Sequence, residues 1–203
     1  MRTITFLIIF ALSSTLAQMV QAQHNKTIVI SPKSELNIVG SSNVNDFQCL
    51  FGFNNKRQSL PVSFQEANNG IIFNKATLSL KNTSFDCGGR AINRDFHSLL
   101  KSEQHPEIIL RLKKLNKKSQ SKNLVEALVE IHIAGKSKEY VLNAKVNQKD
   151  ELHILGNLKL NIKDFGLETP KKMMGLIVVS EQIEINFNLI VEQKTSHITK
   201  FLN

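Results

Sequence analysis

The sequence predicts an all-β fold built on an antiparallel sheet, arranged either as a sandwich or as a closed barrel. Runs of alternating apolar and polar residues, the period of a strand with one buried face, recur along nearly the whole chain after residue 22. Short turns separate these runs, as between antiparallel neighbours. Only one segment has helical spacing, so strands and helices do not alternate as a parallel α/β fold requires.

Residues 1–22 have the pattern of a secretory signal peptide. Arg2 precedes an apolar run from Ile4 to Leu12, and a more polar stretch leads to a cleavage site after Ala22. The alternative is a membrane anchor, but the apolar run is shorter than the roughly 20 residues that span a bilayer. We therefore expect one mature domain over residues 23–203 in a periplasmic or secreted location.

The first half of the mature sequence contains five strand-like runs, which cover residues 26–31, 34–40, 46–53, 60–67 and 70–86. After them, Ile92, Phe96 and Leu99 recur at helical spacing, which predicts a short helix within residues 91–104. The helix must end before Pro106, because the residue before a proline avoids the α region.

The second half contains five further runs, which cover residues 107–115, 124–133, 140–146, 152–162 and 181–193. Residues 134–139 and 148–151 are predicted turns, and residues 163–175 interrupt the alternation. The Lys-rich stretch 111–122 favours a solvated loop. In the last run, Ile183, Ile185, Phe187 and Leu189 share one face. That face either packs into a solid core or lines a hollow, and periodicity alone leaves both open.

Cys49 and Cys87 are the two cysteines of the chain. An even number of cysteines in an exported protein favours a disulfide. The chain-entropy model gives such a bridge about 4 kcal/mol of stabilisation. Two free, buried thiols are the alternative.

Charge and motifs narrow the possible functions. The net charge is +9, but the chain has no Trp, one Tyr and no nucleic-acid motif, so we expect no nucleic-acid partner. The charge is typical of a solvated surface or of transient contact with an anionic membrane surface. The six histidines lack metal-ligand spacing, and no nucleophile or phosphate-loop motif occurs. We therefore expect no enzyme activity, no catalytic residue, no metal and no cofactor.

Three segments resemble the YceI-like family and occur in that family's order. They are "GSSNVNDFQCLFGF" at 40–53, "RAINRDFHSLLKSEQHPEIILRL" at 90–112 and "GNLKLNIKDFGLETPKKMMGLIVVSEQIEINFNLIVE" at 156–192. The resemblance implies a closed, lipocalin-like antiparallel barrel of about eight strands with one short helix inserted mid-chain. It also implies an exported, often dimeric binding protein for an amphiphile such as a polyisoprenoid. The cysteine pair and the Lys-rich connection at 113–122 depart from the family's common pattern.

A hollow barrel would present inward-facing apolar side chains to a ligand. The candidate ligand-binding residues are Phe51, Phe53, Phe64, Leu78, Leu80, Leu110, Leu112, Val129, Ile131, Leu142, Leu158, Leu160, Phe187 and Leu189. Burial of a hydrocarbon tail gains about 0.8 kcal/mol per methylene group, so no charged anchor is required.

Three functions follow from these features. The first is the holding of a polyisoprenoid or isoprenoid quinone for transport, storage or sequestration. The second is a structural or partner-binding barrel with a filled core. The third is an enzyme on the same fold, which would need an acid such as Asp46 or His97 at the barrel mouth.

Overall fold

The computed structural model describes residues 22–53, 57–118, 123–148, 151–169 and 176–192. These residues form eleven strands, one α-helix and two short 3₁₀ helices. The strands are β1 (Gln23–Ile30), β2 (Glu35–Ser42), β3 (Asp46–Phe51), β4 (Gln58–Ala67), β5 (Gly70–Lys81), β6 (Phe85–Asp86), β7 (Glu107–Lys117), β8 (Leu124–Ile133), β9 (Lys136–Gln148), β10 (Leu152–Asn161) and β11 (Val179–Glu192). The helices are η1 (Asn82–Ser84), α2 (Arg90–Leu99) and η2 (Ile162–Phe165).

The strands close into an antiparallel ring. Eight of them follow one another in the order β1-β4-β5-β7-β8-β9-β10-β11, and the end of β1 pairs back onto the end of β11. At this closure Val29 lies opposite Glu192 and Ile30 lies opposite Val191. The ring and the α-helix between β6 and β7 confirm the predicted barrel of about eight strands with one inserted helix.

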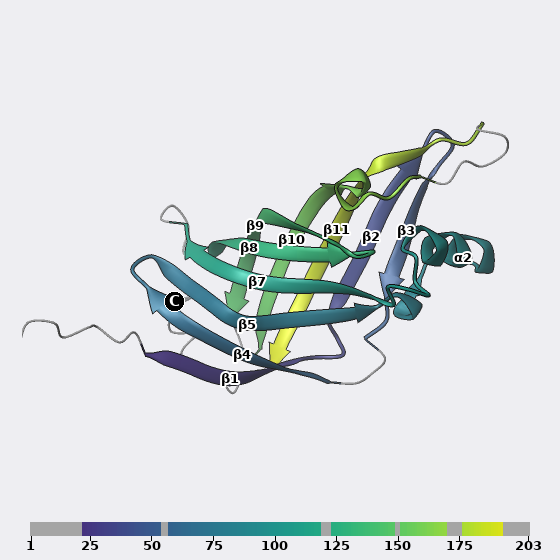
Figure 1. The fold of residues 1–203 in the computed structure, drawn as a ribbon. Coiled ribbons are helices and arrows are strands. Elements are labelled where there is room, and N and C mark those ends of the chain that lie inside the picture. The colour runs from purple at the N-terminus through teal and green to yellow at the C-terminus, as the bar shows by residue number, and fades with distance from the viewer. Residues whose placement is uncertain (1–21, 54–56, 119–122, 149–150, 170–175, 193–203) are drawn as a thin grey trace, which may run out of the picture.

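The three remaining strands, β2, β3 and β6, extend the barrel strands β1, β4 and β5 beyond a bend. β4 pairs with β1 and β5, whereas β3, which leads into β4, pairs with β2 and β6. β1 and β2 therefore act as two halves of one bent strand, as do β3 with β4 and β5 with β6. Figure 1 shows the result: β4, β5 and β7 run across β10, β11 and β2.

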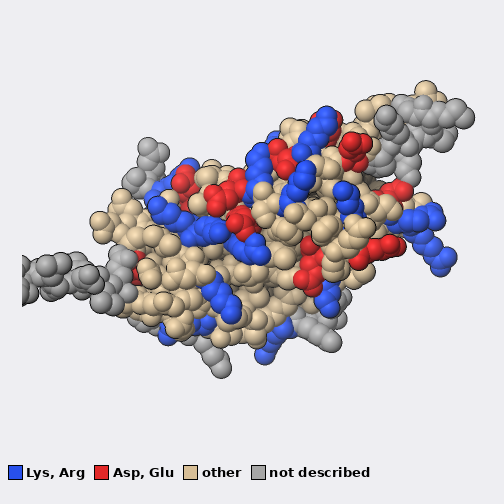
Figure 2. Space-filling model, viewed as in Figure 1, with Lys and Arg blue, Asp and Glu red and all other residues tan. Residues whose placement is uncertain are grey.

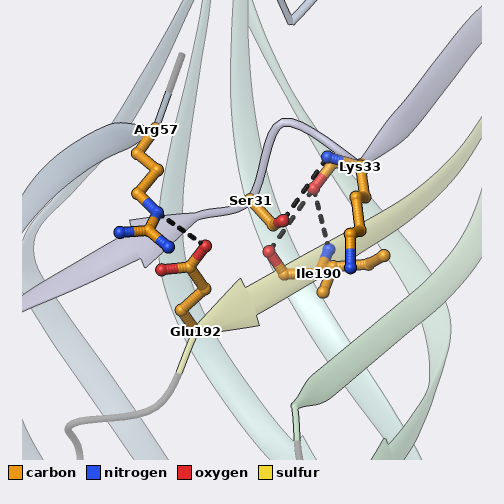
Figure 3. Close-up of polar contacts among 6 residues, drawn as sticks. Ser31, Lys33, Arg57, Ile190 and Glu192 are labelled. Atoms are coloured by element: carbon orange, nitrogen blue, oxygen red, sulfur yellow. Dashed lines mark hydrogen bonds and ion pairs between the residues drawn. The ribbon is translucent and has the colours of Figure 1, made fainter. Parts of the chain in front are cut away.

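The ring is held shut at the corner between β1 and β2 (Figure 3). The N–H of Ser31 donates to the carbonyl of Ile190 over 2.8 Å, and the N–H of Ile190 donates to Oγ of Ser34 over 2.9 Å. Both serines are buried. At the surface, Arg57 pairs with Glu192 over 3.0 Å. These bonds replace the sheet ladder at the bend, so the backbone groups there stay paired away from water.

Two sequence predictions about the region from β7 to β9 were wrong. The predicted six-residue turn at 134–139 is a two-residue hairpin, in which Ala134 and Gly135 have φ values of 47° and 83°. Positive φ at both positions lets two residues reverse the chain, so β9 already begins at Lys136.

The second wrong prediction is the solvated loop over the Lys-rich stretch: residues 111–117 belong to β7, and the strand-like run at 107–115 is confirmed. β7 continues to Lys117 and pairs with β8, with Asn116 opposite Glu126. One of the lysines, Lys113, pairs with Glu130 of β8 over 3.2 Å. Residues 119–122 of the stretch lie outside the described residues, as does the predicted signal peptide apart from Ala22.

No helix among the described residues is long and apolar enough to cross a membrane.

Candidate ligand-binding cavity

An apolar cavity of about 300 Å³ lies inside the ring. Its wall includes inward-facing residues of β1, β2, β4, β5 and β7 through β11, together with Phe96 and Leu99 of α2. The volume lies at the lower end of the roughly 300–1,000 Å³ of small-molecule pockets. Alternate residues of β11, from Ile183 to Val191, line it. The alternating face of the last strand therefore borders a hollow.

The wall has almost no polar chemistry. Among the described residues that line it, none is Asp, Glu, Lys, Arg or His, and the hydroxyl groups come from Thr77, Thr169 and Ser180. Neither Asp46 nor His97, the acids that an enzyme would need, lines the cavity; His97 instead lies 3.2 Å from the carbonyl oxygen of Asn82. The described part of the wall suits a hydrocarbon chain and supplies no titratable group for acid–base catalysis.

Ten of the fourteen candidate residues line this cavity. They are Leu78, Leu80, Leu110, Leu112, Val129, Ile131, Leu142, Leu158, Phe187 and Leu189. They come from β5, β7, β8, β9, β10 and β11, so the ring brings together positions that are far apart in the sequence. Their contact with a ligand stays a prediction.

The other four candidates lie in packed parts of the core. Phe51 makes edge-to-face contacts with Phe53 and Phe85, at ring-centroid distances of 4.9 and 5.0 Å. Phe64 is fully buried in a separate cluster near the β4–β5 hairpin, and Leu160 is buried in the main core. Phe64 shares the β4 face of Leu60 and Val62, which line the cavity, but it is fully buried beside Phe73, with ring centroids 5.9 Å apart, and does not reach the cavity wall.

Sequence reasoning missed the contributions of β1, β2 and α2 to the wall. Ile28 and Ile30 of β1, and Leu36 and Ile38 of β2, line the cavity. Their alternation is visible in the sequence, and so is the helical spacing that includes Phe96. What the sequence does not indicate is that the helix covers the barrel interior.

Two glycines widen the cavity by letting aromatic rings lie against the backbone. A Cβ atom added at Gly156 of β10 would lie 2.5 Å from Cζ of Phe187, the residue that pairs with it on β11. Gly40 of β2 has the same relation to the ring of Phe47 on β3. Both rings line the cavity. A side chain at either glycine would displace the ring above it.

The disulfide anchors the helix beside the cavity. Cys49 and Cys87 are bonded, which confirms the predicted pair. Cys49 lies on β3 and lines the cavity, whereas Cys87 precedes α2 by three residues. The side chain of Asn93 in α2 accepts a hydrogen bond from the N–H of Cys87 over 2.6 Å. These links hold the start of α2 against the wall to which Phe96 contributes.

A charged cluster fixes η2 against β9. The hydroxyl of Tyr140 donates to Asp164 over 2.7 Å, and Nζ of Lys138 lies 2.7 Å from the same carboxylate oxygen. Lys138 first, and then the Tyr140 hydroxyl, hold the pKa of Asp164 below its usual value. Burial, followed by the bond to Asp164, raises the pKa of Tyr140. Ile162, in the same 3₁₀ helix, lines the cavity, so the cluster supports one part of its wall.

Comparison with known proteins agrees with this architecture. The sequence matches the YceI-like domain family over residues 35–191. BcnA from Burkholderia cenocepacia has 19% identity and a TM-score of 0.61, over 78% of this chain and 96% of that chain. A polyisoprenoid-binding domain from Saccharophagus degradans, implicated in plant cell wall breakdown, has 17% identity and a TM-score of 0.60. The match covers 83% of this chain and 99% of that chain.

A YceI protein from Campylobacter jejuni has 20% identity and a TM-score of 0.52, over 61% of this chain and 74% of that chain. At these identities the solved structures establish likeness of fold. The curated proteins that were compared give no significant match. The family match, in contrast, covers most of the chain and includes β2 through nearly all of β11. The ring, its inserted helix and this match together show that the chain belongs to the YceI-like family.

Proposed function

We propose that this protein binds an amphiphilic lipid, a polyisoprenoid or an isoprenoid quinone, with the hydrocarbon tail inside the barrel. The cavity of about 300 Å³, whose described wall has no charged side chain, is the observation that carries the proposal. Membership of the YceI-like family and the likeness of fold to the polyisoprenoid-binding domain from S. degradans support the same class of ligand.

The size of the cavity sets the expected affinity. A group of the size of a water molecule or a methylene occupies about 30 Å³, so the cavity holds roughly ten methylene groups. Burial of about 0.8 kcal/mol for each gives about 8 kcal/mol before ordering costs. Dissociation constants of micromolar order are therefore expected without a charged anchor. The polar head group lies outside the apolar wall, because burial without a partner would be costly.

In this proposal the protein works outside the cytoplasm as a non-catalytic carrier, store or sequestering protein. The signal-peptide pattern of residues 1–22 supports export, and the Cys49–Cys87 disulfide is consistent with an oxidising compartment. The net charge of +9 favours approach to anionic membrane surfaces, with which the lipid would be exchanged.

The test is a titration of purified protein with geraniol, farnesol and geranylgeraniol, read by displacement of the apolar fluorophore N-phenyl-1-naphthylamine. We expect affinity to rise with chain length and to level off once the cavity is filled. Ala127 and Ala144 are buried and line the cavity from β8 and β9. The double variant A127F/A144F fills this space and should lose binding, whereas V141F, at an exposed position of β9, should bind like the wild type.

A milder variant keeps the test informative if the double variant does not fold. Ala144→Leu adds fewer atoms to the same wall, and we expect it to weaken binding to an intermediate degree. A wild-type protein that displaces no fluorophore would contradict the proposal and favour a filled, structural barrel. Equal binding by wild type, A144L and A127F/A144F would mean that the ligand lies elsewhere.

A further inference from the structure

Three large apolar side chains are exposed together at one end of the molecule. Val44 in the β2–β3 turn is 68% exposed, and Leu176 and Val178 before β11 are 74% and 60% exposed. They are three of the six large hydrophobic residues that are exposed in the described part of the chain. We call these three residues the apolar tip. Clustered apolar exposure of this kind marks a surface that contacts another apolar body.

Hydrogen bonds hold the apolar tip in a defined shape. The Asn43 side chain donates to the carbonyl of Leu176 and accepts from the N–H of Val178, both over 2.9 Å. The N–H of Asn43 donates to the carbonyl of Val178 over 3.0 Å. Within the turn, Ser42 Oγ accepts from the N–H groups of Val44 and Asn45. Because these bonds use polar groups within the tip, its outer surface is left to the three aliphatic side chains.

The apolar tip joins the cavity wall. Val179 and Ser180, which follow Val178 directly, line the cavity, and so does Phe47, three residues after Val44. Val179 pairs with Ser42 of the same hairpin. Figure 1 shows this hairpin and the start of β11 projecting together beyond the rest of the ring. Both segments of the apolar tip therefore continue directly into residues of the cavity wall.

The small apolar area of the tip and the positive net charge of the chain favour a lipid bilayer as the partner of the apolar tip. A stable protein interface buries about 800 Å² on each side, far more than three aliphatic side chains supply, so a second copy of this chain is a poor fit. A bilayer needs only a small apolar insertion, aided by attraction between the net charge of +9 and anionic lipids. In Figure 2, many Lys and Arg side chains lie over the face of the barrel strands that is in view.

We propose that the apolar tip docks on the surface of an anionic lipid bilayer and that the cavity exchanges its lipid there. This inference rests on the proposed function, because it names the partner from which the same cavity is filled. The three side chains enter the boundary between head groups and acyl chains, and the lipid tail passes along Val179 and Phe47 without crossing water.

The test compares the wild type with V44S/L176S/V178S. Vesicles of phosphatidylcholine and phosphatidylglycerol carry the anthraniloyl ester of geranylgeraniol, and its transfer to the protein is followed by fluorescence. The variant should transfer the lipid about tenfold more slowly and bind vesicles more weakly in flotation. Its affinity for N-phenyl-1-naphthylamine added from water should be unchanged. L50S/I72S/V141S replaces the other three exposed apolar residues and serves as the matched control.

Each alternative outcome overturns the inference. Transfer and flotation at the wild-type rate in V44S/L176S/V178S would show that the tip does not dock, and so would equal losses in the control. A change from dimer to monomer with unchanged vesicle binding would assign the tip to a subunit interface. Failure of the wild type to bind the fluorophore from water removes the proposed function itself. Normal binding from water with no effect of the tip on transfer removes only this inference.

Discussion

At the scale of single residues, the cavity depends on Gly156, which leaves room for the ring of Phe187. Gly156→Ala would place a Cβ atom 2.5 Å from Cζ of that ring, so the ring must turn into the cavity. Overpacking of this kind costs about 1–3 kcal/mol. We expect a lower melting temperature by circular dichroism and weaker binding of N-phenyl-1-naphthylamine. The double variant G156A/F187L, which has a smaller side chain above residue 156, should regain binding. Wild-type values for G156A would contradict this account of the wall.

A second residue-scale prediction concerns the hairpin between β8 and β9. Ala134 adopts a φ of 47°, a left-handed conformation that costs an L-residue about 1–2 kcal/mol. Asn tolerates this conformation, and Asn-Gly is the preferred pair for a two-residue hairpin turn. Ala134→Asn should therefore stabilise the fold by about 1 kcal/mol in urea unfolding. Ala134→Val should destabilise it, because a β-branched residue resists positive φ. The same midpoint for both variants would argue against this turn geometry.

At the scale of elements, the disulfide links β3 to the start of α2 across 38 residues. The chain-entropy model gives its loss a cost of about 4 kcal/mol. We expect C49S/C87S to unfold at a clearly lower denaturant concentration than the oxidised wild type and to resemble the wild type treated with dithiothreitol. Ligand affinity should also fall, because α2 contributes to the cavity wall. A reductant that leaves the wild-type midpoint unchanged would contradict the prediction.

The contact between η2 and β9 should depend on pH. Lys138, and then Tyr140, hold the pKa of Asp164 below its usual value of 3.8. Because the pKa is lower in the folded state, the stabilisation is present above pH 3.8 and is lost as the pH falls through the folded-state value. Tyr140 is the one Tyr of a chain without Trp, so its fluorescence reports on this contact. We expect an acid transition in wild-type fluorescence and none in D164N. The same transition in both proteins would assign it to another group.

Element positions could be predicted from the sequence where one strand face is apolar and the other polar. The alternation of Leu158 with Lys159 in β10, or of Leu142 with Asn143 in β9, already indicates the inward residue. The same rule did not locate Phe64 correctly, because this residue shares the face of Val62 but packs beside Phe73 and does not reach the cavity. The turn predicted at 134–139 was too long, because Ala is not typical of positive φ and Ala134 therefore gave no sign of a two-residue turn.

At the scale of the whole molecule, no local pattern distinguishes a hollow barrel from a filled one. Leu160 and Ile185 occupy similar alternating positions on β10 and β11, yet Leu160 is buried in the packed core and Ile185 borders the cavity. Strand number and tilt set the separation of opposite walls in a closed barrel, and neither can be read from the alternation of a single strand. Strand bends at the β1–β2 corner, where Ser31 and Ser34 bond to β11, complete that closure.

If the ring encloses a hollow that holds an isoprenoid lipid, the isolated protein should carry that lipid. Native mass spectrometry of the protein purified from its own host tests this expectation most directly, followed by organic extraction and identification of what is released. We expect one polyprenyl or quinone species per chain, which is absent when A127F/A144F is purified in the same way. Wild-type protein that carries no lipid and takes up no added isoprenoid would contradict this expectation.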